Sequence, residues 1–255
     1  MTDLFSLKGK TALVTGGTRG IGLMIARGLV SAGVTVYISS RNEEACASAA
    51  KELGDLGDCT AIPADLSSEQ GCGELVTALN ETTRHLHLLV NNAGAIWSEP
   101  LESFPASAWD KVLDLNLKAP FFLIQLLLPL LEAVATEEDP SRVINIGSIF
   151  GIRASGHHTY SYGASKAALH HLTRVLAGEL GARNITVNAI APGPFESRMY
   201  SPSADPWNGN DAHPPIRRLG RADDIAGTIC YLASRAGSFV TGAVLPVDGG
   251  RSTAV

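Results

Sequence analysis

Short runs of apolar and β-branched residues alternate with helix-like segments along the whole of this 255-residue chain. Most of the runs are almost wholly apolar, which is typical of strands covered on both faces of a parallel sheet. The expected strands cover residues 11–15, 35–39, 60–64, 86–91, 142–147, 186–190 and 244–247. The expected helices cover residues 21–32, 43–53, 70–84, 106–134, 165–181 and 222–234. This alternation predicts a doubly wound parallel α/β sheet of seven strands with helices on both faces.

The composition limits the class of protein further. A chain of 255 residues with 45% hydrophobic and 18% charged residues suits one large core and is not disordered. We find no repeat and no linker, so we expect a single domain over residues 1–255. The formal net charge is −5 and Lys and Arg do not cluster, which argues against a nucleic-acid partner.

Targeting and metal-binding signals are weak. The longest apolar run, residues 119–131, contains two prolines and is too short to span a bilayer. The first residues lack the order of a signal peptide, and the four cysteines are far apart, which favours reduced thiols. The histidine pairs 157–158 and 170–171 are adjacent residues, which on a helix point about 100° apart and rarely share an ion. We expect a cytoplasmic protein that binds neither membrane nor metal.

One segment breaks the alternation. Residues 195–215 contain four prolines and a glycine, which interrupt any regular element. A long irregular segment inside a compact domain is usually functional, so a lid over the substrate is the first interpretation and a disordered surface loop is the alternative. The apolar residues Met199, Tyr200 and Trp207 favour the lid.

A glycine-rich turn follows the first expected strand directly. Gly16, Gly20 and Gly22 are spaced G-x-x-x-G-x-G, which is not the general G-x-G-x-x-G fingerprint of dinucleotide-binding folds. The turn also contains Thr18, and Ile21 begins the next helix. Glycines permit a tight turn, and the helix N-terminus that follows offers N–H groups and positive potential to a pyrophosphate.

The end of the second expected strand indicates which dinucleotide would bind. An NAD site usually has an acidic residue there for the ribose 2′-hydroxyl, whereas this chain has Arg41 and no carboxylate before Glu43. Arg19 projects from the glycine turn, and two guanidinium groups can hold a 2′-phosphate. We therefore expect NADP(H) rather than NAD(H).

Tyr162 and Lys166 are four residues apart, so on a helix their side chains share one face. A tyrosine has a pKa of about 10, and a nearby ammonium group and the positive nicotinamide ring favour the phenolate. Lowering this pKa to about 7 needs about 4 kcal/mol of differential stabilisation. A phenol tuned in this way can donate a proton to a ketone oxygen as hydride reaches the carbon.

Over essentially its full length the chain resembles the short-chain dehydrogenase/reductase superfamily, a family with a Rossmann-like fold. The resemblance rests on several motifs in the expected order: residues 15–22 (TGGTRGIG), 65–66 (DL), 91–94 (NNAG), Asn116 within 114–117 (DLNL), Ser148, Tyr162 with Lys166, 191–193 (APG) and 247–250 (VDGG). Tyr160 is not the catalytic tyrosine, since alanine rather than lysine stands four residues after it. The interval of 14 residues from Ser148 to Tyr162 indicates a one-residue insertion in the loop between them.

The resemblance implies roles for individual residues. Asn116, Ser148, Tyr162 and Lys166 would form a proton-relay tetrad. Asp65 and Leu66 would contact the adenine, Asn92, Ala93 and Gly94 the ribose side, and Pro192 and Gly193 the nicotinamide. It also implies the strand order 3-2-1-4-5-6-7 and a homotetramer, with a homodimer as the alternative.

Within the superfamily, residues 61–68, 142–148, 165–170 and 191–199 resemble the 3-oxoacyl-(acyl-carrier-protein) reductases of the rhamnolipid-pathway type. This favours an NADPH-dependent reductase of a 3-oxoacyl thioester, which could also run in the alcohol dehydrogenase direction. A reductase of another small hydrophobic, cyclic or polyol ketone is the alternative. A non-catalytic NADP(H) sensor would have a broken tetrad, and an epimerase or dehydratase of the extended type would need a longer C-terminal domain and a different glycine spacing.

Overall fold

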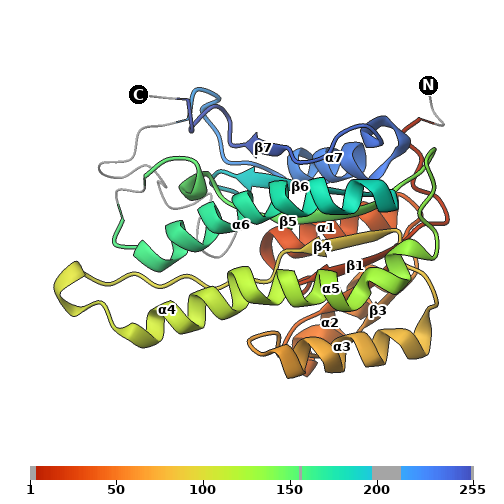
Figure 1. Ribbon diagram of the computed structural model, residues 1–255, viewed down its shortest axis with the longest axis horizontal. Coiled ribbons are helices and arrows are strands. Elements are labelled where there is room, and N and C mark those ends of the chain that lie inside the picture. Colours follow the sequence, from red (N-terminus) through yellow and green to blue (C-terminus); the bar gives the residue numbers. More distant parts are fainter. Residues whose placement is uncertain (1–3, 155–156, 197–213, 254–255) are drawn as a thin grey trace.

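The structure is a computed structural model that describes residues 4–154, 157–196 and 214–253. Seven parallel strands form one sheet in the order β3-β2-β1-β4-β5-β6-β7 (Figure 1). Their bounds are β1 Thr11–Thr15, β2 Thr35–Ser39, β3 Cys59–Ala61, β4 Leu88–Asn91, β5 Ser141–Ile146, β6 Ile185–Pro192 and β7 Val244–Val247. The predicted doubly wound sheet and its strand order are confirmed.

The predicted bounds of β1, β2 and β7 are correct, and two of the differences elsewhere have a clear cause. We expected the third strand to continue to residue 64, but it ends at Ala61. Ile62 and Ala64 still donate to the carbonyls of Ile38 (2.9 Å) and Ser40 (3.1 Å), so the chain stays bonded to its neighbour beyond the end of β3, and Pro63 between them has no N–H. We expected the fourth strand from residue 86, but the N–H of Leu86 donates to the carbonyl of Leu130 at the end of a helix (2.9 Å).

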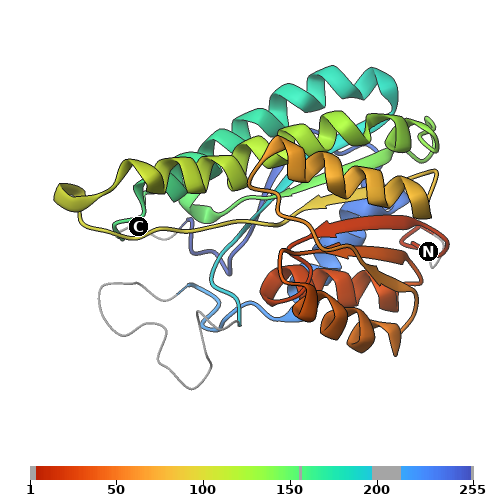
Figure 2. The same ribbon diagram turned by 90° about the horizontal axis from the view of Figure 1, so that it is seen from below.

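Helices cover both faces of the sheet, as Figure 2 shows from below. One face carries α1 Gly20–Ser31, α2 Glu43–Gly54 and α7 Ala222–Ala233, and the other carries α3 Glu69–Thr82, α4 Ala106–Leu113, α5 Ala119–Glu132 and α6 Tyr160–Leu180. Neighbouring residues of one strand supply the two cores, because side chains alternate along a strand. In β1, Val14 packs with α1 and α7, whereas Leu13 packs with α3 and α5.

The expected helix over residues 106–134 is continuous but not regular. A π-helical segment, Asp114–Lys118, joins α4 to α5. By length and composition alone the helix over 106–132 could cross a membrane, a property that core helices of soluble proteins share. Here Leu123, Leu127 and Leu131 are buried in the core between this helix and the sheet.

A buried arginine joins the sheet to α7 at the end remote from the glycine turn. Arg142 lies in β5 and is 1% exposed. Its Nε donates to the carbonyl of Leu232 (3.1 Å) and its Nη2 to that of Ser234 (2.9 Å). The carboxylate of Asp139 lies 3.3 Å from Nη2 and also pairs with Lys10 (2.6 Å). These bonds satisfy most of a cation that would otherwise be costly to bury.

Residues 197–213 of the expected lid lie outside the described residues. The described chain on either side of them is joined. The N–H of Glu196 donates to the carbonyl of Gly220 (3.0 Å), and the N–H of Gly220 donates to that of Pro194 (3.0 Å). These bonds lie just beyond the carboxyl end of β6.

Candidate active site

The glycine turn joins β1 to α1 with Gly16 and Gly20 in the left-handed region (φ 65° and 52°). A Cβ atom on Gly22 would lie 2.2 Å from the carbonyl oxygen of Gly16, so the helix can start this close to the turn only with glycine there. Among the described residues no side chain caps the first turn of α1, and that turn contains no acidic residue. Its N–H groups and the positive end of its dipole are therefore open to a phosphate. Thr18 and Ile21 are half-buried beside it.

Arg19 and Arg41 are both exposed at this edge of the sheet. Arg19 directly precedes α1, and Arg41 follows β2 and precedes Asn42, the N-cap of α2. Within the described part of the chain neither guanidinium has an ion-pair partner. Both are therefore available to an anionic ligand.

Asp65 and Leu66 follow β3 and differ in what they can offer. Asp65 is exposed, and its Oδ1 accepts a hydrogen bond from the N–H of Ser67 (3.1 Å). The side chain of Leu66 is 4% exposed and packs in the core. Leu66 could therefore reach a nucleotide only through its backbone.

Asn92 fastens the end of β4 to the glycine turn. Its Nδ2 donates to the carbonyls of Thr15 (2.9 Å) and Gly16 (3.2 Å). The hydroxyl of Thr15 in turn accepts from the N–H groups of Asn92 (2.9 Å) and Ala93 (3.0 Å). The side chain of Asn92 therefore holds the turn, while Gly94 is exposed.

Asn116 lies in the π-helical segment and is fully buried. Its amide binds both backbone groups of Ala95: Nδ2 donates to the carbonyl (2.9 Å), and Oδ1 accepts from the N–H (2.8 Å). Nδ2 also donates to the hydroxyl of Ser165 (3.0 Å), which donates to the carbonyl of Tyr162 (2.7 Å). A π turn is a frequent feature of functional sites, and here it places one amide between the loop after β4 and α6.

Tyr162 and Lys166 lie one turn apart in α6, with Nζ of Lys166 5.7 Å from the tyrosine ring centroid. Lys166 is 4% exposed, and its Nζ donates to the carbonyl of Ile146 at the end of β5 (2.7 Å). Burial lowers the pKa of Lys166 to about 8. The ammonium group is thus held beside the phenol, and it releases its proton at a lower pH than an exposed lysine does.

The remaining predicted residues follow β5 and β6. Ser148 is 7% exposed, and its hydroxyl accepts from the N–H of Phe150 (3.2 Å), which opens the 3₁₀-helix Ile149–Gly151. Pro192 ends β6, and the N–H of Gly193 donates to the carbonyl of Val247 in β7 (3.0 Å). Because carboxyl ends of parallel strands share one edge, the structure brings the predicted residues to that edge.

The helix that carries the tyrosine starts earlier than expected, at Tyr160 rather than residue 165. Tyr162 therefore lies within the helix and is rigidly related to Lys166. Tyr160 packs its ring on Phe104 (5.2 Å between centroids), and its hydroxyl lies 3.2 Å from Nδ1 of His158. The expected insertion belongs to a loop of which residues 155–156 lie outside the described residues.

Two contributors were not found from the sequence. Thr15 binds the end of β4, and Ser165 relays between Asn116 and the backbone of Tyr162. The role of Ser165 could have been predicted, because a serine in a helix can donate its hydroxyl to the backbone carbonyl three residues earlier, here that of Tyr162. Thr15 had no such local signal, since its partner is 77 residues away in the sequence.

An open helix N-terminus and a tyrosine beside a buried lysine at the carboxyl edge of a doubly wound sheet define a class, the nucleotide-dependent oxidoreductases. More narrowly, the chain belongs to the short-chain dehydrogenase/reductase family. A family described as enoyl-(acyl carrier protein) reductase matches residues 16–252. The resemblance seen in the sequence is thereby confirmed.

Individual relatives cover almost the whole chain. The chain is 53% identical to the rhamnolipids biosynthesis 3-oxoacyl-[acyl-carrier-protein] reductase of Pseudomonas aeruginosa, over 98% of this chain and 99% of that protein. It is 38% identical to the 2-dehydro-3-deoxy-D-gluconate 5-dehydrogenase of Bacillus subtilis, over 97% and 96% of the two chains. Among solved structures, the Pseudomonas aeruginosa RhlG/NADP active-site complex matches with a TM-score of 0.94 and 52% identity, over 99% and 100%.

The buried Lys166 predicts a specific pH dependence of stability. Its pKa is about 8 in the folded protein and near its ordinary 10.5 in the unfolded chain. Between these pH values the unfolded chain holds a proton that the folded protein has released, so this residue makes stability rise with pH. Relative to the variant Lys166→Met, the wild type should gain about 2–3 kcal/mol of unfolding free energy from pH 7 to pH 10, measured by urea denaturation.

The exposed Lys51 provides the control, because Lys51→Met removes an ammonium that stays hydrated in both states. Its difference from wild type should be the same at both pH values. An equally constant difference for Lys166→Met would contradict the burial of its ammonium.

Proposed function

We propose that this enzyme is an NADPH-dependent reductase that transfers hydride to a ketone, with a 3-oxoacyl thioester as the favoured substrate. The observation that carries the reaction class is the Lys166 ammonium, buried one helical turn from Tyr162 and bonded to the end of β5. The substrate class is supported by the 53% identical reductase of Pseudomonas aeruginosa.

The residues at the glycine turn fit a dinucleotide phosphate. Side chains at Gly16 and Gly22 would collide with neighbouring atoms, so the backbone itself is open to close approach. The uncapped N-terminus of α1 suits the pyrophosphate, and the two free guanidinium groups of Arg19 and Arg41 suit a 2′-phosphate. The expected contacts of Asp65, Leu66, Ala93, Gly94, Pro192 and Gly193 with the cofactor belong to the same proposal.

When bound, NADPH supplies the hydride for the ketone carbon. Tyr162 donates its phenolic proton to the ketone oxygen, and the Lys166 ammonium stabilises the phenolate that remains. The Ser148 hydroxyl donates a hydrogen bond to the same oxygen. Asn116 completes the tetrad and holds the loop after β4 and α6 at a fixed separation.

The loops around this edge are apolar, which favours a substrate with a hydrocarbon chain. Large apolar side chains stand exposed after β4, β5 and β6: Ile96 (40%), Leu101 (67%), Ile152 (46%) and Ile216 (57%). The ring of Tyr160 adds an aromatic contact with Phe104. A small polyol ketone is the alternative, supported by the sugar-acid dehydrogenase relative. An NADPH-consumption panel of 3-oxoacyl thioesters, cyclic ketones and keto sugar acids distinguishes the two.

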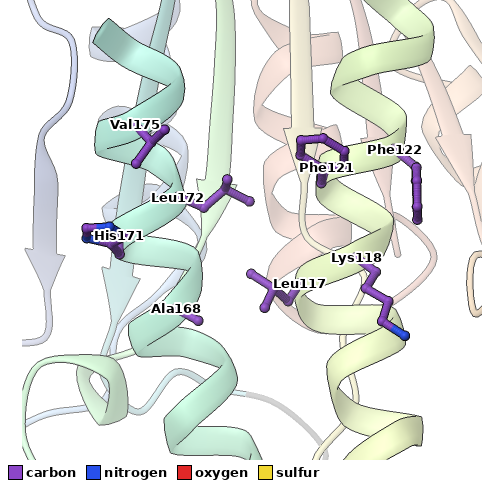
Figure 3. A pocket seen from close by; sticks show the side chains of 8 residues that line it. All are labelled: Leu117, Lys118, Phe121, Phe122, Ala168, His171, Leu172 and Val175. Carbon is purple, nitrogen blue, oxygen red and sulfur yellow. The ribbon is translucent and has the colours of Figure 1, made fainter. Parts of the chain in front are cut away.

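We also propose that the enzyme acts in the cytoplasm as a homotetramer, with a homodimer as the alternative. A groove of about 370 Å³ runs between the outer sides of α5 and α6 and is almost wholly apolar. Figure 3 shows Leu117 and Leu172 facing each other across it, with Phe121 close by. Phe121 (39%) and Val175 (50%) are exposed at this groove, so its apolar side chains are open to a second subunit.

The reaction depends on the phenolic proton, so Tyr162→Phe should lower kcat with a 3-oxoacyl thioester by at least about 10²-fold. The affinity for NADPH should change little, since the ring remains in place. NADPH consumption measures the first quantity and quenching of protein fluorescence measures the second. Turnover close to that of the wild type would exclude Tyr162 as the acid.

The cofactor preference depends on Arg41. Arg41→Asp replaces a charge-assisted hydrogen bond with a repulsion, so KM for NADPH should rise by about 10- to 100-fold. KM for NADH should rise far less, because NADH has no 2′-phosphate. Arg84→Asp, at an exposed position before β4 and away from this edge, should change neither. Equal increases for both cofactors would remove Arg41 from the phosphate site.

Assembly depends on the groove between α5 and α6. Phe121→Glu places a charge where a second subunit would bury apolar surface, so the molar mass in solution should fall to that of a dimer or monomer. Light scattering after gel filtration measures this mass. Leu56→Glu, which alters a similarly exposed leucine after α2, should leave the mass unchanged. A tetramer that survives Phe121→Glu would place the interface elsewhere.

A further inference from the structure

His170 is a buried imidazole to which the mechanism above gives no role. It lies in α6 one turn beyond Lys166 and is 3% exposed. Its Nε2 is enclosed and has no hydrogen-bond partner among the described residues. Burial of an unpaired polar atom is unfavourable, and apolar side chains could fill the same space. A histidine retained at such a position calls for a reason other than stability.

The ring lies directly against the backbone that carries Ser148. A Cβ atom added to Gly147 would lie 2.0 Å from Nε2 of His170, and one added to Gly151 would lie 2.8 Å from its Cε1. These two glycines flank Ser148 and the 3₁₀-helix that follows it. The imidazole therefore fills the space between α6 and the Ser148 turn, and only residues without a side chain fit over it.

The same contact joins two parts of the tetrad. The carbonyl of Ile146, which precedes Gly147, accepts the hydrogen bond of Lys166 Nζ. His170 is thus packed against Gly147 and Gly151, which bound a five-residue segment, and the residue just before this segment is bonded to the catalytic lysine. The thickness of one imidazole ring sets how far Ser148 stands from the helix that carries Tyr162 and Lys166.

The ring is neutral in this place. Burial, and then the nearby Lys166 ammonium, lower the pKa of His170 to about 4, while a hydrogen bond to the Gly151 backbone opposes this. A neutral imidazole can bond to the turn without adding a second positive charge beside Lys166. Lysine or arginine could not do so, and leucine or phenylalanine could not make the bond to Gly151.

We propose that His170 is a positioning residue that holds Ser148 at its working distance from Tyr162 and Lys166. This inference rests on the proposed function, since it assigns His170 to that reaction. Catalytic groups need placement to well under 1 Å, and a displacement of about that size can cost 10²-fold in rate. His170 lies between α6 and the Ser148 turn and not at the glycine turn, so its loss should lower kcat and leave cofactor binding unchanged.

The contact can be tested by a double-mutant cycle. Gly147→Ala should lower kcat by more than about 10²-fold, because its methyl group collides with the ring of His170. His170→Ala should lower kcat by about 10-fold and leave the Kd for NADPH unchanged. The double variant Gly147→Ala/His170→Ala should be more active than Gly147→Ala alone, because the methyl group then occupies space that the ring has left.

Two glycine variants control for the cycle. An alanine at Gly151 would also meet the backbone of Lys166 (2.7 Å) and Ala167 (2.8 Å), so His170→Ala should not rescue Gly151→Ala. Gly178, on the same helix, has nothing within 4 Å of an added Cβ, and Gly178→Ala should leave kcat unchanged. His170→Gln, which can still donate to Gly151, should keep more activity than His170→Leu.

Amide hydrogen exchange of the peptide over residues 147–153 gives a reading that does not depend on turnover. It should be faster in His170→Leu than in the wild type. Losses of kcat that simply add in the cycle, or exchange that does not change, would overturn the role of His170 while the proposed function stands. A wild-type enzyme that reduces no ketone would instead overturn the proposed function, and the assignment of His170 to it.

Discussion

Beside the catalytic tyrosine, a hydrogen bond connects α6 to the end of the central strand β5: Nζ of Lys166 donates to the carbonyl of Ile146. The bond exists because β5 ends there and α6 crosses that end, so the lysine can be buried only with its charge directed at a strand terminus. The position of Tyr162 follows from the same helix, and the position of Ser148 from the same strand. The positions of Ser148, Tyr162 and Lys166 therefore all depend on how β5 and α6 meet.

Much of this arrangement could be predicted from the sequence, because it depends on periodicity and on chain direction. Apolar runs identified the seven strands, and parallel strands necessarily end at one edge, where the motif residues gather. The bounds were less accurate where a bond with a distant partner decides them. β4 starts late because Leu86 pairs with Leu130, and no local pattern contains that information.

Within the site, residue identity was easier to predict than the contact each residue makes. Asn92 is expected on the ribose side of the cofactor, and its amide donates to the carbonyls of Thr15 and Gly16. Leu66 turns its side chain into the core. In both cases the motif is right, yet the side chain stabilises the backbone that a nucleotide would touch. The burial of Arg142 in a mostly apolar strand could likewise not be predicted. Its hydrogen-bond partners lie in and just after α7, some 90 residues further along the chain.

The π-helical segment at Asp114–Lys118 has a further consequence for how this enzyme can change. A π turn is in effect one extra residue accommodated in a helix, and it rotates everything after it by about 100° relative to a regular helix. Asn116, inside this segment, bonds to Ala95 and Ser165, and Phe121, five residues later, lies at the surface. Deletion of one residue here would restore a regular helix. Either the Asn116 amide or the exposed face that carries Phe121 would then point in a different direction. The length of this helix is therefore fixed by two surfaces at once, even though each could tolerate substitutions on its own.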